Sequence, residues 1–256
     1  MAGSEAIGLH RRGTGPALVL LHCLGVDRHL WDFAALGLAA DFTLLTCDFP
    51  GHGETPTPAA AYSIGDLTDR LAALLAHEGL ARAHVAGISL GGLVAQDFAA
   101  RYPERVERLA LIDTTPRYAD AMRAMWAVRA REARQHGVAS LVPGLLDIWF
   151  TADCIQHNPH EVRYVRDTLA RCDGEGYALA CEALAAADLR DGAARIAAPT
   201  LVICGEQDIP SFLESARWLV DSVKGAKLAW LGPARHCSIL EQPEQFGRAL
   251  RSFLAD

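Results

Sequence analysis

The sequence predicts an α/β fold with a mostly parallel, doubly wound sheet and a helical insertion. Short, almost continuously apolar runs alternate along the chain with amphipathic segments, and such runs suit strands that are buried on both faces. A glycine-flanked serine joins one of these runs to a helical segment. The alternation stops between residues 116 and 195, where we expect only helices.

The six apolar runs are the predicted strands. They span residues 17–21, 42–47, 83–87, 109–112, 200–204 and 227–231. Helices are expected between them at 64–80, 93–100, 214–223 and 243–254. In the first of these, Leu67, Leu71, Leu74 and Leu75 recur at the spacing of one helix face.

The helical insertion divides the predicted chain into a core, residues 1–115 and 196–256, and a cap, residues 116–195. The cap segment is rich in Ala, Arg and other helix formers and contains no convincing strand. Open α/β sheets bind ligands at the carboxyl ends of their strands. We therefore expect the insertion to lie over that edge as a lid.

Composition excludes several classes of partner. The chain of 256 residues has a formal net charge of −7, whereas nucleic acids and anionic membranes select for clustered Lys and Arg. No apolar run approaches the roughly 18 residues that span a bilayer, and no signal-peptide pattern opens the sequence. Seven cysteines without a C-x-x-C pair predict reduced thiols and a cytoplasmic location.

The segment Gly87-Ile88-Ser89-Leu90-Gly91 matches the pattern G-x-S-x-G between a predicted strand and a predicted helix. A serine on such a tight turn has a strained backbone that exposes its hydroxyl, and the flanking glycines leave room for neighbouring backbone. The free N–H groups of the following helix point to where negative charge would develop. Ser89 is the predicted nucleophile.

A serine nucleophile needs a base, and the base needs an acid that orients it. In this architecture the order along the chain is serine, acid, histidine. Asp208 follows the strand 200–204 and His236 follows the strand 227–231, so we expect these two to complete a triad. Glu206 and Asp113 are the alternative acids, although Asp113 is better interpreted as a cap of the turn 113–116.

Acyl transfer also needs two N–H donors for the oxyanion. We expect the backbone N–H groups of Leu90, directly after the nucleophile, and of Leu24, in the loop after the first parallel strand. His22 is expected to brace that loop. The glycine-rich turn 48–54 has neither a following lysine nor G-x-G-x-x-G, so it is interpreted as structural. No His, Cys, Asp and Glu cluster has metal-ligand spacing, and we predict no metal.

These motifs together resemble the α/β-hydrolase fold family: they are residues 22–25, 48–53, 87–91, 205–208 and His236. Within that family the chain resembles the 3-oxoadipate enol-lactonases of the β-ketoadipate pathway of aromatic compound catabolism. The stretches that carry this resemblance are residues 20–32, 83–93, 149–150, 175–190, 196–204 and 241–244. The chain departs from the enol-lactonase pattern at Pro50, at 209–211 and at 237–239, which all flank the expected pocket.

The resemblance implies a serine hydrolase that opens a small carboxylated lactone through an acyl-enzyme, without a cofactor. It also implies that Trp149 is a pocket wall, although a plain core aromatic is the alternative. A cation for the substrate carboxylate is sought among the lid arginines Arg117, Arg129, Arg163 and Arg166, any of which could instead be a solvated surface charge. A carboxylesterase, a C–C bond hydrolase and a non-catalytic small-molecule receptor are the alternative functions.

Overall fold

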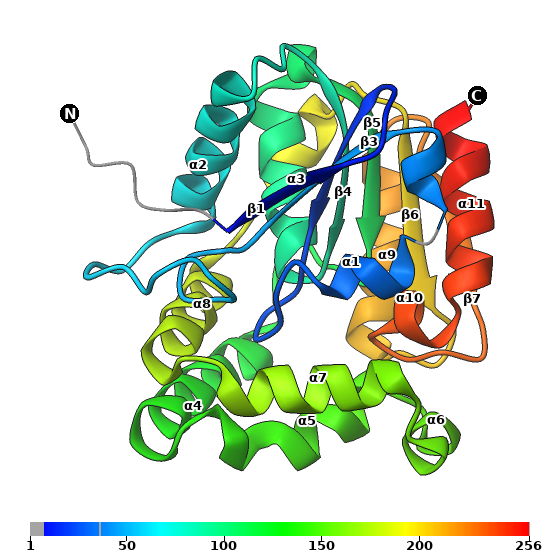
Figure 1. The fold of residues 1–256 in the computed structure, drawn as a ribbon. Coiled ribbons are helices and arrows are strands. Elements are labelled where there is room, and N and C mark those ends of the chain that lie inside the picture. Colours follow the sequence, from blue (N-terminus) through cyan, green and yellow to red (C-terminus); the bar gives the residue numbers. More distant parts are fainter. Residues whose placement is uncertain (1–7, 36, 256) are drawn as a thin grey trace.

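A seven-stranded sheet forms the centre of the computed structural model, which describes residues 8–35 and 37–255 (Figure 1). Its spatial order is β1-β3-β2-β4-β5-β6-β7, and β1 pairs with β3 antiparallel while the remaining pairs are parallel. The strands are β1 (Leu9–Arg12), β2 (Ala17–Leu21), β3 (Thr43–Cys47), β4 (Ala83–Ile88), β5 (Val106–Ile112), β6 (Thr200–Gly205) and β7 (Lys227–Leu231).

All six predicted strands are present, and β1 is an additional one. The sequence of β1, Leu-His-Arg-Arg, is polar and its residues are half-buried or exposed. A strand at the edge of a sheet is hydrogen-bonded to a neighbour on one side only, and charged side chains are common in such strands. Because the strands were predicted from continuous apolar runs, β1 was not predicted.

The helices outside the insertion cover both faces of the sheet. They are α1 (Leu30–Ala34), α2 (Ile64–His77), α3 (Leu90–Arg101), α9 (Pro210–Ser222), α10 (Ser238–Glu241) and α11 (Pro243–Ala255). Helices α2, α3 and α9 lie on one face, and α1 and α11 pack together on the other (Figure 1). The predicted helix 214–223 begins earlier, at Pro210, because proline at the first helical position is already set for helical φ.

The stretch between β5 and β6 is helical. It contains α4 (Asp120–His136), α5 (Val142–Trp149), α6 (Ala152–His157), α7 (His160–Arg171) and α8 (Gly174–Ala186). These helices lie across one end of the sheet, at the bottom of Figure 1. Among the described residues of the stretch between β5 and β6, the only β-type pairing is a bridge between Arg117 and Asp188, which joins the two ends of the stretch.

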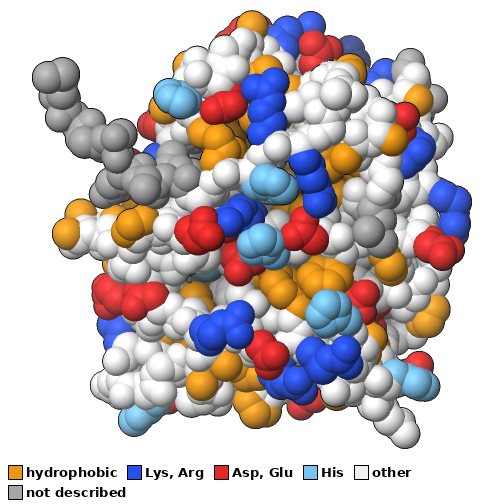
Figure 2. Space-filling view, viewed as in Figure 1, with side chains coloured by type: hydrophobic (Ala, Val, Ile, Leu, Met, Phe, Trp, Pro, Cys, Tyr) orange, Lys and Arg blue, Asp and Glu red, His pale blue; other side chains and the backbone are white. Residues whose placement is uncertain are grey.

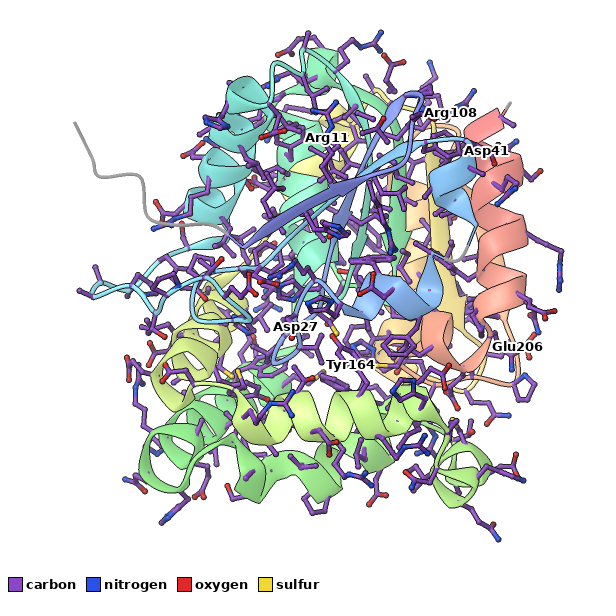
Figure 3. All side chains as sticks on the ribbon, viewed as in Figure 1. Arg11, Asp27, Asp41, Arg108, Tyr164 and Glu206 are labelled. Carbon is purple, nitrogen blue, oxygen red and sulfur yellow. The ribbon has the colours of Figure 1, made fainter. Side chains whose placement is uncertain are left out.

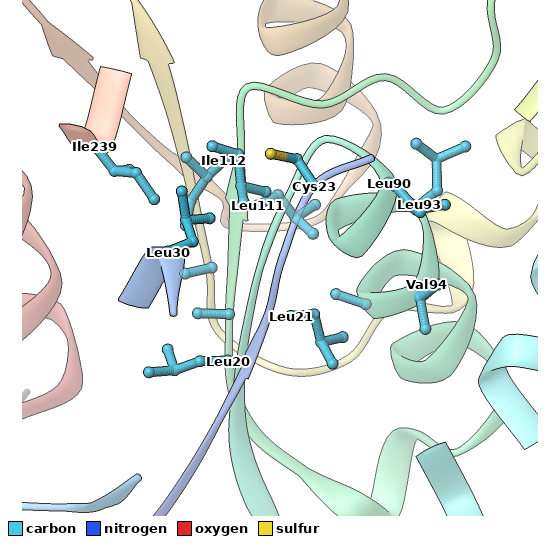
Figure 4. Packing of buried hydrophobic residues seen from close by; sticks show 14 of the residues in the cluster. Leu20, Leu21, Cys23, Leu30, Leu90, Leu93, Val94, Leu111, Ile112 and Ile239 are labelled. Carbon is cyan, nitrogen blue, oxygen red and sulfur yellow. The ribbon is translucent and has the colours of Figure 1, made fainter. Parts of the chain in front are cut away.

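The core lies on both sides of the sheet. Figure 4 shows Leu21 and Leu111 of the strands between Leu93 of α3 on one side and Leu30 of α1 on the other, and all four are buried. Removal of this apolar surface from water is the main stabilising term for such a sheet. The register of the buried parallel strands brings the ends of β4, β5 and β6 to one edge.

The surface agrees with the charge balance of the sequence. Acidic and basic side chains are interspersed over the face shown in Figure 2. None of the described helices is both long and apolar enough to cross a membrane. All seven cysteines are free thiols.

Candidate active site

Ser89 occupies the turn between β4 and α3 with φ 53° and ψ −113°. Positive φ is unusual for a residue with a side chain and stores of the order of 1–3 kcal/mol of strain. The turn is held from both sides, because the Ser89 N–H donates to the carbonyl of Ile112 (2.9 Å) and the Thr114 hydroxyl donates to the carbonyl of Ser89 (2.9 Å). The Ser89 side chain caps no backbone group of α3, which leaves its hydroxyl for other contacts.

The two glycines of the turn are required by close backbone approach. A Cβ on Gly87 would collide with the carbonyl of Gly91, and a Cβ on Gly91 would collide with the carbonyl of Leu21 in β2. The Gly91 N–H also donates to the carbonyl of His22 (3.1 Å). The glycine spacing therefore allows α3 to start directly against the end of β2.

The structure brings Ser89, His236 and Asp208 together from three loops. His236 Nε2 lies 3.1 Å from Ser89 Oγ, and His236 Nδ1 lies 2.9 Å from Asp208 Oδ2. All three side chains are buried. With Nδ1–H donated to the carboxylate, the Nε2 lone pair faces the serine hydroxyl and can accept its proton.

The charge of Asp208 dominates the electrostatics of His236. Burial by itself lowers the pKa of His236, but the carboxylate of Asp208, its hydrogen bond and the nearby Asp113 raise the pKa to about 9. Asp208 is fixed in turn by the Ile209 N–H, which donates to Oδ1 (2.7 Å). The imidazolium form is thus stabilised, as a base that takes up a proton during a reaction requires.

Asp113, one of the two alternative acids, does not touch the imidazole ring. Its carboxylate accepts from the Gly205 N–H (2.9 Å) and from the N–H (3.2 Å) and hydroxyl (2.6 Å) of Ser238. The interpretation of Asp113 as a cap of its own turn is therefore wrong, because its partners are far away in sequence. Burial, and then the charge of Asp208, raise the pKa of Asp113 to about 7.

Glu206, the other alternative acid, is exposed and its side chain packs against Gly232. Figure 3 shows it at the edge of the molecule. Glu206 lies in the same loop as Asp208, but the loop points only Asp208 inward. Asp208 is thus the acid that contacts His236 in the structure.

The loop after β2 lies against the serine. Leu24 lines a cavity together with Ser89 and His236, and Leu90 is the first residue of α3, where a helix has no internal acceptor for the N–H. His22 is buried between two loops: its Nε2 accepts from the Phe49 N–H (2.9 Å) and its Nδ1 lies 2.7 Å from the Cys23 carbonyl. Burial lowers the pKa of His22, and the two contacts of its ring brace this loop.

Comparison with known proteins agrees with this geometry. The model of the α/β-hydrolase fold family matches residues 16–142. The chain is 33% identical to 3-oxoadipate enol-lactonase 2 of Acinetobacter baylyi over 239 residues, which is 93% of this chain and 88% of the relative. The chain belongs to the α/β-hydrolase family.

Two further relatives of this α/β-hydrolase are named for different reactions, one as an esterase and the other as an enol-lactonase. A pimeloyl-[acyl-carrier protein] methyl ester esterase of Chromobacterium violaceum is 33% identical, and the match covers 94% of this chain and 95% of the relative. The crystal structure of the enol-lactonase from Burkholderia xenovorans superposes with a TM-score of 0.93 at 35% identity and covers 98% of this chain and 96% of that one.

The cavity above Ser89 has a volume of about 40 Å³. Besides Leu24, Ser89 and His236 it is lined by Tyr118, Met122, Met125, Trp126, Arg129, Ile148, Trp149, Ile209 and Phe212. This volume has room for roughly three water molecules. In this conformation the α/β-hydrolase therefore encloses a small, mainly apolar space around its serine.

Aromatic side chains flank the histidine. The ring centroid of Phe212 lies 4.3 Å from that of His236, and that of Trp149 lies 6.3 Å away. Trp149, from α5, is also tied to the histidine loop, because its carbonyl accepts from the Cys237 N–H (2.9 Å). The structure thus places Trp149 in the wall of the cavity.

The four candidate arginines, all within the described residues, have different positions. Arg117 lies in a separate outer pocket of about 340 Å³ and pairs with Asp120 (2.5 Å) and Asp188 (3.4 Å). Arg163 is exposed and donates to the carbonyl of Asn158, and Arg166 pairs with Asp167 (3.3 Å). Of the four, Arg129 is the one that lines the cavity.

One face of α4 supplies cavity residues that sequence reasoning missed. Met122, Met125 and Trp126 line the cavity with Arg129, and the four lie at i, i+3, i+4 and i+7. That spacing was available in the sequence as a signal. The composition of the segment alone, rich in Ala and Arg, did not reveal which face would be turned to the serine.

Proposed function

We propose that this α/β-hydrolase is a serine hydrolase that opens a small carboxylated lactone through a Ser89-His236-Asp208 triad. The observation that carries the proposal is the relay of 3.1 Å and 2.9 Å contacts from Ser89 Oγ through His236 to Asp208, next to an enclosed cavity. The relatives named as enol-lactonase and methyl ester esterase support a carboxylic ester hydrolase.

In the proposed mechanism His236 Nε2 takes the proton of Ser89 as Oγ attacks the lactone carbonyl. The N–H groups of Leu24 and Leu90 hold the oxyanion. His236 then gives its proton to the leaving enolate oxygen, which stays attached to the acyl chain because the ester is cyclic. A water deprotonated by His236 hydrolyses the acyl-enzyme, and the enol product tautomerises to a ketone.

We further propose that residues 116–195 act as the lid of a core formed by residues 1–115 and 196–256. Helices α4 and α5 supply cavity walls, and Trp149 would contact the substrate. Where α7 meets the loop after β2, the hydroxyl of Tyr164 donates to Asp27 Oδ1 (2.7 Å). Both residues are labelled in Figure 3. A closed lid would exclude bulk water and so strengthen the electrostatic contacts at the serine.

A carboxylesterase is the second candidate, because the Chromobacterium violaceum relative is named as a methyl ester esterase. Both reactions use the same nucleophile, base and oxyanion donors. They differ in whether the leaving oxygen departs or remains tethered.

The test is the loss of ultraviolet absorbance of 3-oxoadipate enol-lactone, with p-nitrophenyl acetate as the reference ester. The intact protein is compared with Ser89→Ala. Fast lactone loss that disappears in the variant would support both the triad and the substrate. Hydrolysis of the aryl ester alone would leave the nucleophile in place and rule out the lactone, with Pro50 and the start of α9 as the first suspects.

A further inference from the structure

The hydroxyl of Tyr118 is a buried donor that the fold itself does not use. Tyr118 lies between β5 and α4, its side chain is 2% exposed, and its Oη has no hydrogen-bond partner among the described residues. Tyr118 also lines the cavity above Ser89. Buried polar groups in folded proteins are nearly always paired, so an unpaired hydroxyl in the wall of this cavity indicates a group that a bound substrate satisfies.

Packing holds the ring of Tyr118 in place. It meets the ring of Trp126 edge-on with centroids 5.2 Å apart, and the ring of Phe212 edge-on with centroids 6.2 Å apart. The backbone beside it is fixed as well, because the Thr115 hydroxyl donates to the carbonyl of Arg117 (2.7 Å). A donor that is held in this way needs no reorganisation when charge develops near it.

The side chain of Tyr118 lies on the histidine side of the site. Phe212, which Tyr118 meets edge-on, packs against the ring of His236 with centroids 4.3 Å apart. Burial raises the pKa of Tyr118 and the Ser89 hydroxyl opposes this rise, so the two hydroxyls lie near one another although no hydrogen bond joins them. The raised pKa also keeps the phenol protonated, and therefore able to donate.

Two oxygens of an ester need a partner when Ser89 attacks its carbonyl carbon: the carbonyl oxygen, which becomes the oxyanion, and the leaving oxygen. The N–H groups proposed for the oxyanion belong to Leu24 and Leu90. The leaving oxygen must lie near His236 instead, because His236 protonates it. Tyr118 shares a wall of the cavity with His236, so its hydroxyl is better placed for the leaving oxygen than for the oxyanion.

We propose that Tyr118 donates a hydrogen bond to the leaving oxygen of the substrate. This inference rests on the proposed hydrolase function and adds a fourth side chain to its reaction. As the C–O bond breaks, its electron pair moves to the leaving oxygen, which takes a proton from His236 while Tyr118 keeps its own. The hydrogen bond helps a strongly basic leaving oxygen most, so it adapts the site to lactones and esters of enols and other poor leaving groups.

The experiment compares two esters with the same acyl group, p-nitrophenyl acetate and phenyl acetate. Phenolate is the more basic of the two leaving groups and gains more from a hydrogen bond. Tyr118→Phe, which keeps the ring and removes only the hydroxyl, is expected to lower kcat/KM for phenyl acetate about 10- to 100-fold, and for p-nitrophenyl acetate less than about 3-fold. Both esters carry the same acyl group, so a difference between them reports on the leaving oxygen.

Tyr177→Phe is the matched control. Tyr177 belongs to α8, is fully buried and also has an Oη without a partner among the described residues, but it does not line the cavity. This variant should change neither ester. An equal loss on both esters in Tyr118→Phe would assign the hydroxyl to the serine or the oxyanion, and no loss on either would remove it from the site. Each of these two results would overturn the proposal.

The melting temperature separates this role from a structural one. Because the Tyr118 hydroxyl is buried without a partner, its removal should leave the melting temperature of Tyr118→Phe equal to or above that of the intact protein. A clearly lower melting temperature would mean that the hydroxyl stabilises the fold itself, and the proposal would then fail.

The role of Tyr118 and the proposed lactone reaction can fail separately. If the enol-lactone is not opened but Tyr118→Phe loses activity selectively on phenyl acetate, Tyr118 keeps its role and the lactone falls. If the enol-lactone is opened equally fast by the intact protein and by Tyr118→Phe, the lactone stands and the role of Tyr118 falls.

Discussion

Asp113 and Asp208 lie side by side below His236, with a carboxylate oxygen of each and the Cys204 sulfur all within 4.8 Å of one another. Only Asp208 contacts the imidazole ring, at 2.9 Å from Nδ1. Asp113 instead joins the loop of Asp208, through the Gly205 N–H, to the loop of His236, through Ser238. The two carboxylates therefore differ in position: one contacts His236 and the other holds the two loops.

The first prediction follows from that difference. Asp208→Asn should lower kcat/KM about 10³-fold or more, since the amide no longer stabilises the imidazolium and favours the wrong tautomer. Asp113→Asn should cost about 10-fold or less, because the amide oxygen still accepts one of the backbone N–H bonds. Steady-state kinetics on one ester measures both variants. The opposite ranking would move the acid to Asp113.

The pH dependence of kcat/KM provides the second prediction. His236 must be neutral to accept the serine proton, and its pKa is raised to about 9. The rate should therefore rise with pH through a limb that lies above the ordinary histidine value of about 6.5. Asp113→Asn removes a negative charge near the ring and should shift this limb to lower pH by about half a unit or more. An unshifted limb, or a shift to higher pH, would argue against a charged Asp113.

Backbone strain at Ser89 gives the third prediction. Ser89→Ala and Ser89→Gly should each lower turnover about 10³-fold or more, because the nucleophile is lost. Their stabilities should differ: glycine tolerates φ 53°, so Ser89→Gly should raise the free energy of unfolding by about 1 kcal/mol, whereas Ser89→Ala keeps the strained Cβ. Denaturant melts of the three proteins measure this difference. Equal stability of the two variants would mean that the turn is not strained.

The fourth prediction concerns the glycines of the same turn. Gly87→Ala places a methyl group against the carbonyl of Gly91 and should cost about 1–3 kcal/mol of unfolding free energy as well as activity. Gly247→Ala is the matched control, since Gly247 lies in α11 with open space around its Cα. That change should stabilise the protein by about 0.5–1 kcal/mol. Similar effects of the two substitutions would contradict the close approach seen at the turn.

The sequence was sufficient where the signal is local. Each buried strand is a short apolar run between turns, so all six predicted strands were found, while the polar edge strand β1 was not. The order of Ser89, Asp208 and His236 could be inferred because each follows a strand, and parallel strands end at one edge of a sheet. The structure brings these three side chains into contact.

Tertiary packing decided what lies opposite the serine. Residue type alone does not say which of the arginines between β5 and β6 faces inward: Arg129 lines the cavity, whereas Arg117 and Arg163 lie outside it. Likewise Asp113 is not a turn cap, because its partners Gly205 and Ser238 come near only after the sheet has formed. The sequence by itself determined which loops carry Ser89, Asp208 and His236, because each of these loops follows an apolar run that can be recognised locally. The rotation of each helix between β5 and β6 depends on contacts between distant segments, and only the folded structure fixes it.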